Sequence, residues 1–128
     1  MARPYILCVD DERDVTDLLR FLLARAGCDT AAAATGRAAL DALRARRPDL
    51  VLLDLMLPDL DGLGVCEILR RTPSTADIPV VMLTAWTSDE ARAHGRVLGA
   101  LDHLAKPFSP RELVNRLPRW LGKTAAPA

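Results

Sequence analysis

Short runs of apolar residues alternate along the chain with longer segments of helical periodicity. Val51, Leu52 and Leu53 form a continuous apolar run, which is typical of a strand covered on both faces by helices. In the segment 12–26 the apolar residues recur at the i, i+3, i+4 and i+7 spacing of an amphipathic helix, and they are Val15, Leu18, Leu19, Leu22 and Leu23. The pattern therefore predicts an α/β protein.

The same pattern predicts five units, each a strand followed by a helix. The predicted strands are 5–9, 28–34, 51–53, 79–83 and 101–105, and the predicted helices are 12–26, 36–47, 62–71, 88–98 and 109–121. Short connections between such units imply right-handed crossovers, and hence a parallel sheet between two layers of helices.

Three local features qualify this prediction. Only the context makes 28–34 a strand, because its four consecutive alanines have no β preference. Gly27 and Gly99 are expected to end the helices that precede them. Pro118 lies inside the last predicted helix and is expected to bend its final turn.

Length and charge bound the kind of protein. A chain of 128 residues is the size of one domain, which we place at 1–122, with 123–128 as a short tail or the start of a linker. The 17 basic and 17 acidic residues give no net charge, so we expect no direct contact with nucleic acid or membrane. No apolar run approaches the length of a membrane span, and 1–4 lacks the apolar region of a signal peptide, so we expect a cytoplasmic protein.

The three cysteines, Cys8, Cys28 and Cys66, are odd in number and lack the spacing of metal ligands. We predict that they are small buried hydrophobic residues of a reduced protein, with neither a disulfide nor a zinc site.

Polar residues follow four of the predicted strands. Asp10 and Asp11 follow the first strand, Asp54 the third, Thr84 the fourth and Lys106 the fifth. In open parallel sheets, ligands and chemistry collect outside the carboxyl ends of the strands. The sequence therefore predicts three carboxylates, a hydroxyl and an ammonium at the edge of the sheet where the strands have their carboxyl ends, which we call the rim.

These elements resemble the receiver domain of two-component response regulators, over about residues 4–121. The resemblance rests on Asp10-Asp11, on Asp54 with the loop 57–62, on Thr84-Ala85 and on Lys106-Pro107-Phe108, all in order and correctly spaced. It implies a flavodoxin-like (βα)5 sandwich of three layers, whose parallel sheet has the strand order 2-1-3-4-5 found in chemotaxis regulators. It also implies a cis peptide bond between Lys106 and Pro107.

The resemblance further implies a signalling switch and not an enzyme in the ordinary sense. A sensor histidine kinase or a phosphotransfer protein would donate a phosphoryl group to Asp54, and the new charge would change a surface that binds a downstream partner. The protein would be a phosphoacceptor that assists its own phosphorylation and dephosphorylation. The sequence names neither the kinase nor the downstream partner.

A cluster of three carboxylates favours a hard divalent cation, Mg²⁺ or Mn²⁺, because the like charges repel one another. The resemblance implies that Asp11 is a direct ligand, that Asp10 helps through water, and that Asp54 and the backbone carbonyl of Met56 complete the set. The alternative for the aspartate pair is that it caps the first helix.

Asp54 is the candidate nucleophile, since a carboxylate can attack phosphorus. Lys106 would contact one phosphoryl oxygen as a point charge and Thr84 would donate its hydroxyl to another. Taken singly, Thr84 is also explained as a β-branched residue ending a strand, and Lys106 as a solvated surface residue.

Three rival functions fit the sequence less well. A metal-dependent phosphatase with an aspartyl nucleophile needs a second acid two residues after it, where this chain has Met56. A nucleotide- or flavin-binding module needs a glycine-rich phosphate loop, and the first strand leads instead into carboxylates. A degenerate receiver that serves only as a scaffold would not need all the residues for accepting a phosphoryl group, and this chain has the complete set of Asp10, Asp11, Asp54, Thr84 and Lys106.

The predicted output face consists of 88–98, 101–105 and the last helix. The resemblance implies that Thr84 moves toward the phosphate. In other family members an aromatic residue, usually Tyr or Phe, then turns inward. This chain has His103 at the position of that aromatic residue. This histidine is either a partly exposed residue without a role or a titratable version of the switch.

The same face carries charges that resemble those used for dimerisation by winged-helix regulators, namely Asp102, Glu112 and Arg116. A homodimer through this face is one expectation, and a monomer or a different protein partner is the other.

Overall fold

Five parallel strands form one sheet in the order β2-β1-β3-β4-β5, which confirms the predicted order. In this computed structural model the strands are β1 (Tyr5–Val9), β2 (Asp29–Ala33), β3 (Leu50–Asp54), β4 (Val80–Thr84) and β5 (Asp102–Ala105). The structure describes residues 3–60, 62–84, 89 and 99–125.

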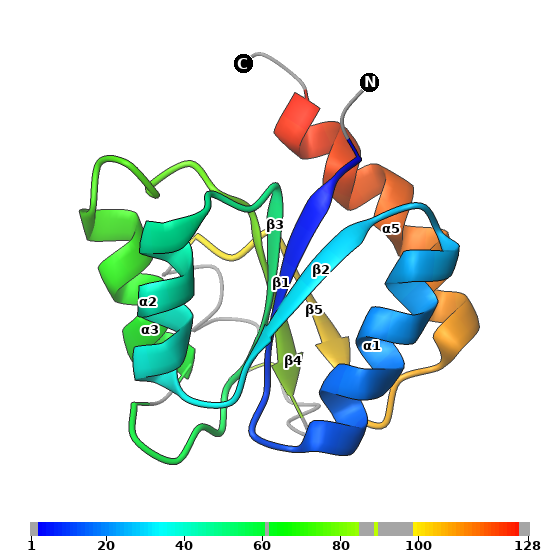
Figure 1. Cartoon of the computed structure of the whole chain (residues 1–128), viewed down its shortest axis with the longest axis horizontal. Coiled ribbons are helices and arrows are strands. Elements are labelled where there is room, and N and C mark those ends of the chain that lie inside the picture. The colour runs from blue at the N-terminus through cyan, green and yellow to red at the C-terminus, as the bar shows by residue number, and fades with distance from the viewer. Residues whose placement is uncertain (1–2, 61, 85–88, 90–98, 126–128) are drawn as a thin grey trace.

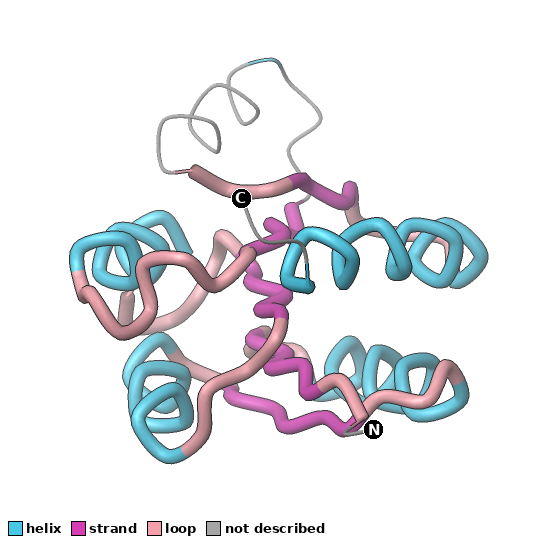
Figure 2. The backbone as a smooth tube through the Cα atoms, turned by 90° about the horizontal axis from the view of Figure 1, so that it is seen from above, coloured by secondary structure: helices cyan, strands magenta, loops and turns pink. Residues whose placement is uncertain are grey.

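Helices cover both faces of this sheet and make the molecule three layers deep (Figures 1 and 2). The helices α2 (Gly36–Ala45) and α3 (Gly62–Arg71) lie on one face, and α1 (Arg13–Arg25) and α5 (Pro110–Ala125) lie on the other. Of the helix predicted at 88–98, the structure describes only residue 89. The predicted α/β architecture is thus confirmed, and four of its five predicted helices are present in the described part of the chain.

The core lies on both sides of the central strands, which are buried at every position. Side chains alternate along each strand, so Val51 and Leu53 pack toward α2 and α3, whereas Leu50 and Leu52 pack toward α1 and α5. This two-sided burial explains why the central strands read as continuous apolar runs. Cys8, Cys28 and Cys66 are buried within this core, as predicted.

The strand of alanines exists as predicted, at the edge of the sheet. Each residue of β2 has a partner in β1, from Tyr5 opposite Asp29 to Val9 opposite Ala33. Its alanines leave little side-chain volume between the sheet and the helices α1 and α2, both of which β2 contacts. Packing therefore decides the strand where intrinsic preference does not.

The helix ends follow the sequence closely at α1 and less closely at α5. Gly27 has a φ of 91°, and the Cys28 N–H donates to the Leu23 carbonyl at 3.0 Å, so the predicted helix end is confirmed. The last helix continues to Ala125, beyond the expected end near residue 121, with Pro118 inside it. Across the described residues, no helix combines the length and the apolar character that a bilayer crossing requires.

Candidate functional site

Four of the predicted site residues stand at the carboxyl ends of neighbouring strands. Asp54 ends β3 and Thr84 ends β4, while Asp10 follows β1 and Lys106 follows β5. Only 1% of Asp10, 3% of Asp54 and 1% of Thr84 is exposed. The parallel sheet therefore brings two carboxylates, a hydroxyl and an ammonium to one largely dry rim.

Lys106 is the centre of an ionic cluster at this rim. Its Nζ lies 2.5 Å from Asp10 Oδ2, 3.3 Å from Asp54 Oδ2 and 3.7 Å from Glu12 Oε1. The peptide bond to Pro107 is cis, as predicted, and the Lys106 N–H donates to the Thr84 carbonyl at 2.7 Å. This backbone bond joins the lysine directly to the end of β4.

The surroundings oppose the charge of Asp54 and favour that of Lys106. Burial raises the pKa of Asp54 and the charge of Asp10 raises it further, although the Met56 N–H and Lys106 act in the opposite direction. Burial alone would lower the pKa of Lys106, but its close contact with the Asp10 carboxylate and the charges of Asp10 and Asp54 outweigh this and raise it. The ammonium thus stays charged between two carboxylates that repel each other.

The first loop holds a group of acids that suits a divalent cation. Asp10, Asp11 and Glu12 each offer a carboxylate oxygen, and these oxygens lie within 4.8 Å of one another. Asp10 Oδ2 is buried and, among the residues that the structure describes, finds only the ionic contact with Lys106 and no well-directed hydrogen-bond donor. Oxygen ligands of this kind are what Mg²⁺ and Mn²⁺ prefer, so the residues fit such an ion.

Sequence reasoning did not assign Glu12 to this group. The available signal was the run of three consecutive acids after the first strand. The alternative that the aspartate pair caps the first helix is not supported, because the N-cap residue of α1 is Glu12 and it has no side-chain capping bond. Asp10 Oδ1 instead accepts from the Glu12 N–H at 2.9 Å, which tightens the turn before the helix.

The loop after β3 turns closely around Asp54. The Met56 N–H donates to Asp54 Oδ1 at 3.1 Å, and the Met56 side chain is 62% exposed beside it. The Gly62 N–H donates to the Leu55 carbonyl at 2.9 Å, and a Cβ on Gly62 would meet both the Asp54 carbonyl oxygen and, at 2.7 Å, the Leu55 Cα. Glycine is therefore required where the loop returns to the strand.

The charged residues of the predicted output face contact one another within the chain. Arg116 pairs with Glu112 and with Asp102 Oδ2 at 3.4 Å, and it donates to the His103 carbonyl at 3.0 Å. His103 is half-buried on β5.

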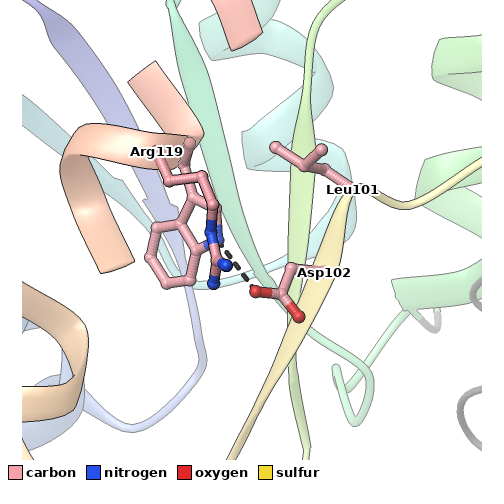
Figure 3. A pocket seen from close by; sticks show the side chains of 4 residues that line it. Leu101, Asp102 and Arg119 are labelled. Atoms are coloured by element: carbon pink, nitrogen blue, oxygen red, sulfur yellow. Dashed lines mark hydrogen bonds between the residues drawn. The ribbon is translucent and has the colours of Figure 1, made fainter. Parts of the chain in front are cut away.

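Asp102 also accepts from the Trp120 indole N–H at 2.9 Å, beside a pocket of about 300 Å³ lined by Leu101, Asp102, Arg119 and Trp120 (Figure 3). Sequence reasoning missed this bond, which joins β5 to the last turns of α5.

Comparison with known proteins gives a consistent result. The sequence model of the response regulator receiver domain matches residues 6–118. The DNA-binding response regulator MtrA of Mycobacterium tuberculosis H37Rv is 46% identical over 115 residues, which are 90% of this chain and 49% of MtrA. The chain spans about half the length of the curated relatives it matches.

Solved structures show the same fold. The receiver domain of the Francisella response regulator 1452 has a TM-score of 0.88 at 32% identity, covering 95% of this chain and 99% of that one. The chemotaxis protein CheY4 of Vibrio cholerae has a TM-score of 0.87 at 32% identity, covering 92% and 98%.

These relatives correct one prediction. We expected no direct contact with nucleic acid because the net charge is zero, but similar proteins such as MtrA are DNA-binding response regulators. The reasoning was wrong because the charge balance describes the half of such regulators that this sequence matches, and it carries no information about the other half.

Proposed function

The chain belongs to the response regulator receiver domain family, a family of phosphorylation-dependent signalling switches, and from this membership we propose that Asp54 is its phosphoacceptor. The observation that supports this most directly is the contact of Asp54 Oδ2 with the Lys106 ammonium at 3.3 Å, at a buried strand end beside Asp10.

The proposed reaction is a transfer of a phosphoryl group from a phosphohistidine of a sensor kinase or phosphotransfer protein. A carboxylate oxygen of Asp54 forms the new bond to phosphorus while the bond from phosphorus to the imidazole nitrogen breaks. The electron pair of that bond leaves with the imidazole, which takes up a proton. Lys106 meets one phosphoryl oxygen as a point charge, and Thr84 donates its hydroxyl to another.

Asp10, Asp11, Asp54 and the Met56 carbonyl would hold Mg²⁺ or Mn²⁺, with Glu12 at the edge of the group. When bound, the ion supplies positive charge that offsets the carboxylates and the phosphoryl oxygens. Without the ion, and among the residues that the structure describes, Lys106 is the only cationic side chain within 4 Å of the Asp10 and Asp54 carboxylates. We therefore propose that phosphorylation depends on a divalent cation, and that Asp54 with its neighbours also assists loss of the phosphoryl group.

A cytoplasmic location is part of the same proposal, and the burial of all three cysteines as small core residues agrees with a reducing compartment.

The test uses a small phosphodonor such as phosphoramidate, with and without Mg²⁺, and reads the product on a phosphate-affinity gel. We expect a shifted band for the wild type only when the metal is present, and none for Asp54→Asn. Equal labelling of the two proteins would show that Asp54 is not the phosphoacceptor. Labelling that is unaffected by chelation would show that phosphorylation does not require a divalent cation.

A further inference from the structure

We propose that Asp59 is a positioning residue of the phosphoacceptor site, which holds the loop after β3 against the N-terminus of α2 and thereby fixes the metal-binding segment at Met56. This inference rests on the proposed function, because it concerns the same site. Asp59 lies in the loop, five residues after Asp54, and is exposed.

The carboxylate of Asp59 makes two bonds to a helix that is distant in sequence. Its Oδ1 accepts from the Gly36 N–H at 2.8 Å, and its Oδ2 accepts from the Arg37 N–H at 3.1 Å. Both donors belong to the first turn of α2, where backbone N–H groups have no partner inside the helix. Oδ1 also accepts from the Leu60 N–H at 2.8 Å, which stiffens the loop locally.

Close packing accompanies these bonds. A Cβ placed on Gly36 would lie 2.8 Å from the Leu60 Cβ and 3.1 Å from the Leu60 carbonyl oxygen. Leu60 packs in turn against the core between the sheet and the helices α2 and α3. The loop and the first turn of α2 therefore touch through both main chain and side chain, and only a glycine at position 36 allows it.

The negative charge of Asp59 strengthens this contact. Its pKa lies below the ordinary value because the N–H groups of Gly36 and Arg37 favour the ionised form. The positive end of the helix dipole acts in the same direction. The contact therefore favours the ionised carboxylate of Asp59.

The anchored loop is the one that forms one side of the site. The Met56 N–H is bound to Asp54 Oδ1 at one end of the loop, and the Gly62 N–H is bound to the Leu55 carbonyl at the other. Between them, Asp59 supplies the bonds to α2. Without these bonds residues 57–60 would move relative to α2, and the Met56 carbonyl would lose its fixed direction.

A metal titration with a matched control separates this role from simple stability. Thr35 caps the same helix, since its Oγ1 accepts from the Ala38 N–H at 3.0 Å, but that bond stays within α2. Thr35→Ala and Asp59→Ala therefore both weaken the start of α2, and only Asp59→Ala releases the loop. Electron paramagnetic resonance of free Mn²⁺ gives the dissociation constant of each variant, and urea unfolding gives its stability.

We expect Asp59→Ala to bind Mn²⁺ about tenfold more weakly than the wild type, the size typical of losing a group that orients a metal ligand. Labelling by phosphoramidate should slow by a similar factor. Thr35→Ala should keep the wild-type affinity at a comparable loss of stability. Asp59→Asn, which keeps one acceptor for the Gly36 N–H, should fall between the wild type and Asp59→Ala.

Each outcome decides between the two proposals. If the wild type binds no Mn²⁺ and takes up no label, the proposed function fails and this inference falls with it. If the wild type binds and Asp59→Ala binds equally well, or Thr35→Ala loses as much affinity, Asp59 has no positioning role and the proposed function stands. If Asp59→Ala does not fold, Asp59→Asn decides in the same way by its affinity relative to Thr35→Ala.

Discussion

Asp54 and Asp10 place two carboxylates in a nearly dry environment with one ammonium between them. Like charges at such a site are not fully compensated by one cation. The ionisation of Asp54 in the folded protein therefore costs stability.

In metal-free buffer at neutral pH, we expect Asp54→Asn to raise the free energy of unfolding by about 1 kcal/mol, the scale of an imperfectly compensated buried polar group. The pKa of Asp54 is raised in the folded state, so its ionisation costs stability above that raised value and costs nothing below its ordinary value. The gain should thus disappear as the pH falls below the ordinary range of a carboxyl group. Urea unfolding at several pH values measures it.

Asp77→Asn is the matched control, because Asp77 is exposed and its hydrogen bond from Arg47 lowers the pKa instead. A neutral side chain there should give no gain in stability. If Asp54→Asn were no more stable than the wild type, the repulsion at the rim would be smaller than its geometry indicates.

Lys106 and Asp11 should act on different parts of the reaction. Asp11→Ala removes a proposed metal ligand and should weaken Mn²⁺ binding by at least about tenfold. Lys106→Ala removes a cation that competes for Asp10, so it should bind Mn²⁺ at least as tightly as the wild type and yet lose labelling by phosphoramidate. Indistinguishable metal affinities of the two variants would show that this division of roles is wrong.

The residues of the site differ in how far sequence could predict them. Asp10, Asp54, Thr84 and Lys106 each lie at the end of a strand or directly after it, and parallel strands end at one edge, so their meeting could be predicted. The contact of Asp59 with Gly36 could not be predicted, because it joins a loop to the start of a helix 23 residues earlier, and nothing in local periodicity encodes it. The Trp120 bond to Asp102 was missed for the same reason, at a separation of 18 residues.

At the scale of the elements, the connection from β3 to α3 leaves no room for a side chain at Gly62. In Gly62→Ala the new methyl group would collide with main-chain atoms of Asp54 and Leu55, which cannot move aside as a side chain can. We expect a loss of about 3 kcal/mol in the free energy of unfolding, at the upper end of the cost of overpacking. Thermal or urea unfolding measures this loss.

Gly122→Ala gives the opposite expectation in α5, because nothing lies within 4 Å of the added Cβ. An alanine in a helix is favoured over glycine by about 1 kcal/mol. Two substitutions of the same kind should therefore change stability in opposite directions, and a Gly62→Ala protein as stable as the wild type would contradict the close turn around Asp54.

Strands and helices were predicted best where one force dominates. The apolar runs of β3 and β4 indicate buried strands from the sequence alone. The alanines of β2 are compatible with any kind of element, and pairing with β1 makes this segment a strand. Element ends were predicted to within a few residues, except that α5 continues past the expected end near residue 121 to Ala125. In this chain the helix continues past Pro118, although an interior proline removes one hydrogen bond of the ladder.

At the scale of the whole molecule, metal binding and folding should be linked. A ligand that binds only the folded state stabilises it by about 1.4 kcal/mol at ten times its dissociation constant. We expect Mg²⁺ at that concentration to raise the melting temperature by about 4 °C. Differential scanning calorimetry with and without Mg²⁺ measures the shift.

Asp11→Ala should lose this shift, whereas Asp41→Ala should keep it, because Asp41 is an exposed acid paired with Arg44 on α2 and does not belong to the acidic group of the first loop. A shift of equal size in both variants would place the stabilising ion somewhere other than the acidic rim.

The path of the chain through the sheet has a practical consequence. β1 begins and α5 ends at the end of the sheet opposite to Asp54, which lies at the far end of a strand about 16 Å long (Figure 1). A protein attached to a biosensor chip through a tag at either end would thus present its acidic rim to the solution. Ions, phosphodonors and a kinase could then be passed over one immobilised sample, with the support on the opposite side from the chemistry.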